Sequence, residues 1–332
     1  MKRQNIQVLR VLACFGILAV HIGQRLELQG HVMNIAYFGA MGVYLFFLIS
    51  GYVCWLSFSK VNGEKLKLSK YYIGRFARIL PVYYTVILFQ FILHSYILND
   101  VPVDETHIGW FRYVFFINEV IPVDNGFWTN LGAVWTISAF MLFYLIAPFL
   151  YRYIRGYNTA LIAWLISYFL YFVWNRRLPD SYNPVKFMMF FLFGIVIYYI
   201  EAEKKEMQLL IFYIINLLTI AIHLIHWEVH TWTMLFGLII LVTRDLVIHN
   251  NLLSRCIDIL DEYSYSIYLV HPLVVEHIDV WKLTHTSNWK IQAVMIIIVE
   301  TVAGVILVHN IIEKPIYRFI MKNVGKKEKE SR

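Results

Sequence analysis

Arg10 and His21 are ionisable residues inside the first long apolar segment of the chain. A titratable side chain within a membrane span is costly to bury and is a functional candidate by default. Eleven residues at about 100° each return to within about 20° of the same helix face, and a rise of 1.5 Å per residue puts the two about 16 Å apart. A guanidinium can hold phosphate through two parallel N–H groups. An imidazole can accept a proton from a hydroxyl near neutral pH.

This arrangement suits a reaction that joins a phosphorylated donor from one side of a membrane to a hydroxyl acceptor approached from the other side. The alternative is structural: the Arg10 guanidinium reaches lipid headgroups, and His21 is a hydrogen-bonded packing residue. We favour the functional interpretation of the pair, because both costly side chains fall on the same stripe of one helix.

The segments that must position these residues are membrane-spanning helices. Of the 332 residues, 59% are hydrophobic and only 15% are charged, whereas soluble domains carry about a quarter charged residues. Apolar windows of about 20 residues, enough to cross a bilayer as a helix, recur along the whole chain, and lipid offers no partner to the backbone of any other structure. The sequence therefore predicts an all-α, polytopic integral membrane protein with about ten transmembrane helices. The predicted spans are residues 6–24, 36–58, 79–98, 131–150, 157–174, 184–200, 207–226, 230–248, 263–281 and 291–312.

The distribution of basic residues predicts the orientation. Ten spans place both termini on one side, and 21 of the 29 Lys and Arg residues fall on that side, seven on the other and Arg10 within the first span. This bias follows the positive-inside rule, so we expect a multi-pass protein of the cell membrane with both termini in the cytoplasm. Residues 1–321 are expected to form one membrane domain and residues 322–332 a short basic tail. The net charge of +7 then reflects the basic residues on the cytoplasmic side. We therefore expect membrane lipid as a partner and no nucleic acid.

Two polar regions outside the spans leave alternatives open. The longest loop, 99–130, combines carboxylates with aromatic residues, which suits either sugar binding or an interfacial aromatic belt. Residues 223–230 hold three histidines and a glutamate at a predicted outer helix junction, without the closed spacing of a metal site, so we expect no metal.

Five segments, in order along the chain, resemble the motifs of the acyltransferase-3 family of integral-membrane O-acyltransferases. Each motif alone is weak, but five in the right order cover essentially the whole chain. They are Asn5 to Arg10 followed by His21 as an Arg-x10-His signature, Phe46 to Tyr52, Arg75 to Tyr84 with its Arg-x-x-Arg pattern, Tyr263 to Pro272, and Ile312 to Pro315.

The resemblance implies transfer of an acetyl or other short acyl group from cytoplasmic acyl-CoA to a hydroxyl of an envelope polysaccharide or a lipid-linked sugar. It implies that His21 is the catalytic histidine and Arg10 its partner in the signature. Arg75 and Arg78 would be the paired arginines near the CoA site, with acetyl-CoA the expected co-substrate. For these two arginines, which we expect on the basic inner loop, plain positive-inside topology is the alternative explanation.

Other features qualify this interpretation. Phe140 and Met141 stand where many members of the family carry acidic residues, which puts in doubt any carboxylate role for that helix and suggests a different acceptor. His271 and Pro272 belong to a family motif, but a helix kink explains them as well as catalysis does. The alternative function is a transporter or flippase for a polysaccharide or lipid-linked sugar. Against that alternative, the sequence shows no inverted repeat and no paired broken spans.

Overall fold

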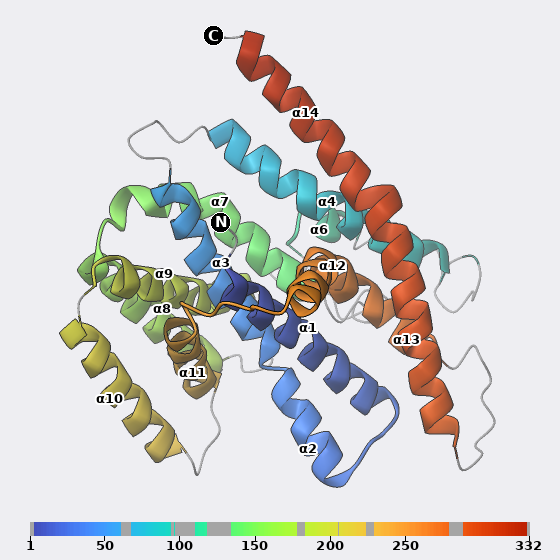
Figure 1. Ribbon diagram of the computed structural model, residues 1–332, viewed down its shortest axis with the longest axis horizontal. Helices are drawn as coiled ribbons and strands as arrows, with labels where there is room; N and C mark the ends of the chain where they lie inside the picture. The colour runs from blue at the N-terminus through green and yellow to red at the C-terminus, as the bar shows by residue number, and fades with distance from the viewer. Residues whose placement is uncertain are drawn as a thin grey trace. The chain divides into compact units, whose positions relative to one another are not determined.

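The computed structural model describes residues 3–60, 68–93, 96, 110–117, 134–177, 183–204, 206–223, 229–278 and 288–330. Within these ranges every regular element is a helix, which confirms the all-α prediction (Figure 1). The elements are α1 (Gln4–Arg25), α2 (Gly30–Gly39), α3 (Gly42–Ser59), α4 (Leu68–Ile92), α6 (Trp110–Val114), α7 (Val134–Tyr153), α8 (Tyr157–Arg177), the 3-10 turn η3 (Pro184–Phe187), α9 (Met188–Ala202), α10 (Glu206–His223), α11 (Val229–Val242), α12 (Asn251–Glu276), α13 (Trp289–Leu307), the π-helical η5 (Val308–Glu313) and α14 (Lys314–Glu330).

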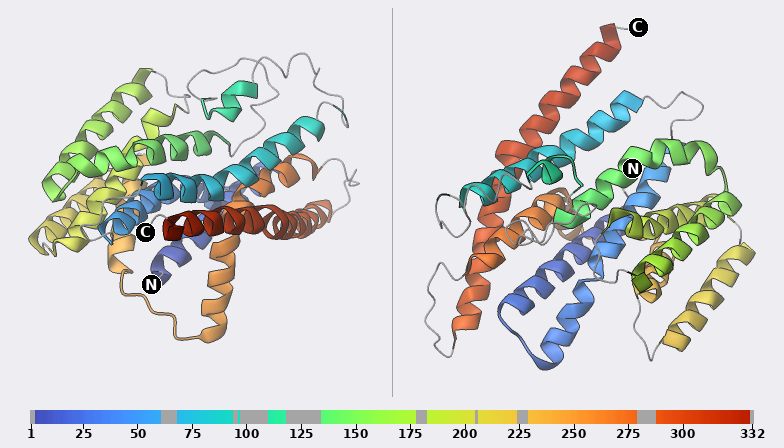
Figure 2. Two further views of the ribbon diagram at one scale, coloured as in Figure 1. Left: turned by 90° about the horizontal axis from the view of Figure 1, so that it is seen from above. Right: turned by 180° about the vertical axis from the view of Figure 1, so that it is seen from behind.

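Seven helical stretches in the described residues are long and apolar enough to cross a membrane. They begin with α1 and end with one continuous stretch, Trp289–Val324, in which α13, η5 and α14 follow one another as a single rod (Figures 1 and 2). The predicted spans 207–226, 230–248 and 263–281 fall on α10, α11 and α12, which are helical but outside this set. Each predicted window thus overlaps a helix. That all ten of these helices cross the membrane stays a prediction.

Two helices begin earlier than hydropathy indicates. α4 starts at Leu68, so it carries Arg75 and Arg78, which were expected on a loop. α12 starts at Asn251, ahead of the predicted span 263–281, and its first turns hold several polar residues. The reason is physical: apolar windows locate only the length that lipid can cover, whereas a helix continues through polar residues because it satisfies its own backbone hydrogen bonds.

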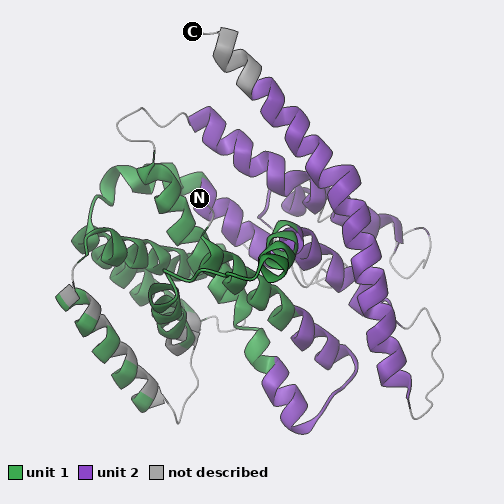
Figure 3. Cartoon of the chain, in the orientation of Figure 1, with its two compact units in different colours: residues 1–17, 37–65, 145–262 green, residues 18–36, 66–144, 263–332 purple. Residues whose placement is uncertain are grey.

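The chain divides into two compact units (Figure 3). Unit 1 comprises residues 1–17, 37–65 and 145–262, and unit 2 comprises residues 18–36, 66–144 and 263–332.

Within unit 1, the backbones of α3 and α9 come into direct contact at two glycines. A Cβ atom added to Gly51 would lie 1.9 Å from the carbonyl oxygen of Phe191, and one added to Gly194 would lie 2.0 Å from that of Leu48. Small residues at a helix crossing let two backbones meet in a membrane, where burial of apolar surface gives little gain between helices. These glycines therefore set how closely α3 and α9 pack.

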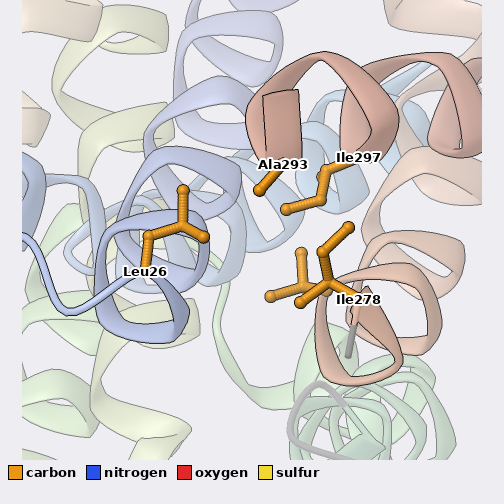
Figure 4. Close-up of a cluster of buried hydrophobic side chains, with 5 residues drawn as sticks. Leu26, Ile278, Ala293 and Ile297 are labelled. Atoms are coloured by element: carbon orange, nitrogen blue, oxygen red, sulfur yellow. The ribbon is translucent and has the colours of Figure 1, made fainter. Parts of the chain in front are cut away.

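Within unit 2, a buried apolar cluster holds the end of α1 against the end of α12 and the start of α13. Figure 4 shows Leu26, Ile278, Ala293 and Ile297 gathered there, and Val275 completes the cluster. All five side chains are at most 4% exposed. Because Leu26 directly follows α1 and Val275 lies in α12, this cluster fixes the neighbouring turns of both helices.

We predict that Gly51→Ala and Gly194→Ala lower stability by about 1–3 kcal/mol each, because the added methyl group must push backbones apart. Gly74→Ala is the control. Its Cβ meets nothing within 4 Å in α4, so we expect a gain of up to about 1 kcal/mol from helix propensity. Thermal unfolding of the detergent-solubilised variants, followed by size-exclusion chromatography, measures this. Equal unfolding temperatures for all three variants would contradict the close crossing.

Candidate active site

In unit 1, the intramembrane guanidinium of α1 is held by a carboxylate of α12. Arg10 donates from Nε to Asp261 Oδ1 at 2.7 Å and from Nη2 to Asp261 Oδ2 at 2.8 Å. The Asp261 side chain is 5% exposed and that of Arg10 is 26% exposed. Two parallel N–H to oxygen bonds of this kind are the strong form of an arginine–carboxylate pair. The charge of Arg10 is therefore balanced within the protein.

The same pair of helices makes a second polar contact one turn away, in which a neutral amide bonds a carboxylate. Gln7 donates from Nε2 to Asp258 Oδ1 at 2.7 Å. Gln7 and Arg10 are three residues apart on α1, and Asp258 and Asp261 are three residues apart on α12, so side chains of one helix face meet side chains of another. This register leaves Arg10 little freedom to move.

A third polar cluster in unit 1 fixes the beginning of the chain. Arg3 donates from Nη1 to both carboxylate oxygens of Glu201 on α9, at 2.7 and 2.9 Å, and also bonds the Tyr52 hydroxyl of α3. Tyr52 in turn donates to Glu201 at 2.5 Å. Burial alone would lower the pKa of Arg3, but its hydrogen bonds to Glu201 and the nearby charges raise that pKa overall. The segment before α1 is thus tied to α3 and α9.

In unit 2, the other intramembrane residue of α1 lies beside a second imidazole. The ring centroids of His21 and His271 are 5.2 Å apart, with an angle of 49° between the ring planes. His271 is 1% exposed, and His21 is partly buried. The α1 and α12 helices each supply one member of both pairs: Arg10 and His21 come from α1, and Asp261 and His271 from α12.

Arg75 and Arg78 are on α4, three residues apart. The Arg75 guanidinium carbon lies 5.4 Å from the ring centre of Tyr71 and 5.0 Å from that of Tyr144. Tyr71 also donates its hydroxyl to the Tyr144 carbonyl at 3.2 Å. Arg78 is exposed. Contact with two aromatic rings restricts the Arg75 side chain, and a guanidinium is a planar donor that suits phosphate.

A buried polar network surrounds the π-helical turn of unit 2. Ser266 of α12 donates to Glu313 Oε2 at 2.6 Å, and His309 Nδ1 lies 2.9 Å from the same oxygen. All three residues are at most 5% exposed. A π-helical turn widens a helix locally and is frequent at functional sites. Here His309 and Glu313, four residues apart in that turn, bond each other.

The structure brings each predicted residue of α1 to a partner that the sequence alone did not identify. Asp261 precedes the predicted apolar span 263–281, where a carboxylate looks like an ordinary loop residue. Its only signal is the matching three-residue step of Asp258 and Asp261 beside that of Gln7 and Arg10. From the sequence alone, a helix kink at Pro272 explains the His271–Pro272 motif as well as a catalytic role does, so the contact between His21 and His271 could not be predicted. Most of the loop 99–130 and residues 224–228 of the histidine-rich junction lie outside the described residues.

Comparisons with known proteins agree with these motifs. A family model described as an acyltransferase domain matches residues 3–309. A protein of Acidianus two-tailed virus, named as an acetyltransferase, is 24% identical over 260 residues, which are 73% of this chain and 75% of the viral protein. The peptidoglycan O-acetyltransferase OatA of Listeria monocytogenes is 29% identical over 155 residues. That match covers 43% of this chain and only 23% of the Listeria protein. No solved structure matches the chain.

We predict strong energetic coupling between Arg10 and Asp261. Arg10→Gln and Asp261→Asn should each destabilise the protein, because each leaves a charge of low exposure without its partner. The double variant should be more stable than the sum of the two losses implies, by about 1–3 kcal/mol. Unfolding in mixed detergent micelles measures the four states of this cycle.

Asp258→Asn is the matched control, since it makes the same change at an exposed carboxylate on the same helix face. It should cost less than Asp261→Asn. Additive losses for Arg10→Gln and Asp261→Asn would show that the pair contributes nothing specific.

Proposed function

From the premise that this chain belongs to the acyltransferase-3 family, we propose that it transfers a short acyl group from cytoplasmic acyl-CoA to a hydroxyl of an envelope glycan or a lipid-linked saccharide. The chain is a membrane O-acyltransferase by family and by its apolar helices. Its donor, acceptor and catalytic base are the parts that we propose. The observation that carries the proposal is the placement of His21 beside a second buried imidazole, in the family's signature helix. Family membership favours this activity over the transporter alternative.

The donor side of the proposal rests on α4. Acyl-CoA carries several phosphate groups, and guanidinium groups bind phosphate through paired N–H donors. Arg75 contacts two tyrosine rings, and Arg78 is exposed three residues further on. We assign these two residues to the phosphates of the donor. With both termini in the cytoplasm, the early turns of α4 lie on the cytoplasmic side, where acyl-CoA is available.

The acceptor side rests on His21. In the proposed step the acceptor hydroxyl gives its proton to the free nitrogen of the His21 imidazole, and its oxygen attacks the thioester carbonyl. The new carbon–oxygen bond forms as the carbon–sulfur bond breaks, and the departing thiolate takes the proton back from His21. The products are an ester and free CoA thiol. A general base of this kind contributes about 10²–10⁴-fold to a rate.

Arg10 has a different proposed role. Its guanidinium is neutralised by the buried carboxylate of Asp261, which weakens its attraction for a phosphate. We assign it to positioning: it holds α1 in register with α12. This keeps Arg10 within the catalytic apparatus, as the signature implies, without direct contact with the donor.

The acceptor class is supported by a relative. The Listeria protein is named a peptidoglycan O-acetyltransferase, and peptidoglycan is a glycan of the cell envelope. We propose the same broad class for this chain and acetyl-CoA as its donor.

We predict that His21→Ala lowers the transfer of labelled acetyl from acetyl-CoA to envelope acceptor by about 10²–10⁴-fold, because the hydroxyl loses its base. Purified protein in lipid vesicles is assayed for ester-linked label. The control is His31→Ala, which removes an exposed imidazole from the next helix and should keep the full rate. Unchanged transfer by a folded His21→Ala variant would remove the catalytic assignment.

We predict that Arg75→Gln raises the KM for acetyl-CoA by about 10-fold to 100-fold, the loss of roughly 1.5–3 kcal/mol from a hydrogen bond to a charged group. Arg78→Gln should act in the same direction. Arg244→Gln serves as the control, because Arg244 is exposed and pairs with its neighbour Asp245. A donor KM that stays at the wild-type value in Arg75→Gln and Arg78→Gln would place the donor elsewhere.

A further inference from the structure

His271 has one ring nitrogen whose role is fixed by the backbone. Its Nδ1 lies 3.0 Å from the carbonyl oxygen of Ile267, one turn earlier in α12. A carbonyl oxygen can only accept, so Nδ1 must carry the hydrogen of this bond. In the neutral ring Nε2 then has a lone pair and no hydrogen, which makes it an acceptor.

That acceptor has no partner among the described residues. His271 Nε2 is buried and makes no hydrogen bond there, and the whole residue is 1% exposed. A buried polar atom left without a partner costs about 1–3 kcal/mol, and such atoms are rare in folded proteins. A purely structural role, in which His271 bonds the carbonyl of Ile267, explains Nδ1 but leaves Nε2 unexplained.

The proposed base, His21, is the imidazole that lies beside His271. His21 contacts His271 ring to ring, with 5.2 Å between the centroids. Another aromatic neighbour of His271 is Tyr268, at 5.9 Å, whose hydroxyl already bonds Thr136 at 2.9 Å. The apolar cluster around Leu26 and Val275 holds the end of α1 against α12, four residues or more along each helix from these histidines. The ring of His21 therefore has a buried acceptor beside it on a firmly packed helix.

We propose that His271 is a positioning residue for His21, a role that rests on the proposed function above. In the reacting state one N–H of His21 donates to Nε2 of His271. This bond fixes the tautomer of His21, so its other nitrogen faces the acceptor hydroxyl with a free lone pair.

The proton balance is simple. The hydroxyl proton passes to the free nitrogen of His21 and then to the departing thiolate, while the hydrogen shared with His271 stays on His21. When His21 carries both protons, the bond to Nε2 stabilises the imidazolium, because hydrogen bonds from charged donors are stronger than neutral ones. His271 ends the cycle unchanged.

Substitutions at position 271 separate this role from a structural one. His271→Phe keeps a ring but removes the acceptor, and it should lower kcat by about 10-fold to 100-fold, part of the contribution of a general base. The KM for acetyl-CoA should stay within about twofold, because the donor contacts are on α4. His271→Gln places an amide oxygen near the former Nε2 and should recover much of the lost kcat. His271→Asn, whose amide reaches only as far as Nδ1, should not.

His277→Phe is the matched control. His277 makes the same kind of bond, from Nδ1 to the Leu273 carbonyl at 2.6 Å, so its substitution shows the effect of losing such a bond away from His21. We expect a wild-type kcat for this variant. All variants are assayed as full-length protein in vesicles, after their unfolding temperatures have been compared.

The outcomes distinguish the two levels of the proposal. A wild-type kcat for His271→Phe, in an enzyme that His21→Ala inactivates, would overturn the role of His271 and leave the proposed function intact. Equal rates for His271→Gln and His271→Asn would also overturn it, and this comparison still decides if His271→Phe fails to fold. Full activity of His21→Ala would instead overturn the proposed function.

Discussion

A polar group buried between membrane helices must find its partner inside the protein, and this constraint governs how α1 is held. Arg10 is paired with Asp261, and His21 lies beside His271. Both partners come from α12. In water such pairs would contribute little, but where lipid replaces water an unpaired charge is expensive. The two ionisable side chains that make α1 a functional candidate, Arg10 and His21, therefore also hold it against α12.

The two pairs have different roles: Arg10–Asp261 suits stability, and His21–His271 suits reactivity. The Arg10–Asp261 pair is fully bonded, with two short charge-assisted bonds, and suits a residue that holds a helix in place. The His21–His271 pair is incompletely bonded, because Nε2 of His271 has no hydrogen bond within the described part of the chain. Saturated polar contacts rigidify a site, whereas an unused acceptor beside a base can hold one N–H of that base while its other nitrogen takes the proton that moves during the reaction.

The sequence predicts the helices well and their partners poorly, for a physical reason. Lipid requires long apolar runs, so windows such as 6–24 and 157–174 locate helices directly. Arg10 and His21 stand out because they are costly within such a run. Asp261 lies in a polar stretch, where a carboxylate is unremarkable, and more than 200 residues separate it from Arg10. Packing between helices, at contacts such as Gly51 against Phe191, decides which helices meet. The pattern of residues along one segment does not predict that.

The central claim, that this protein makes an ester rather than moving a sugar across the bilayer, is tested by stoichiometry. Purified protein in sealed vesicles is given acetyl-CoA only on the side of its termini, and both free CoA thiol and ester on the envelope acceptor are measured. We predict one thiol released for each ester formed. Acceptor that crosses the bilayer with neither ester nor thiol produced would contradict the claim.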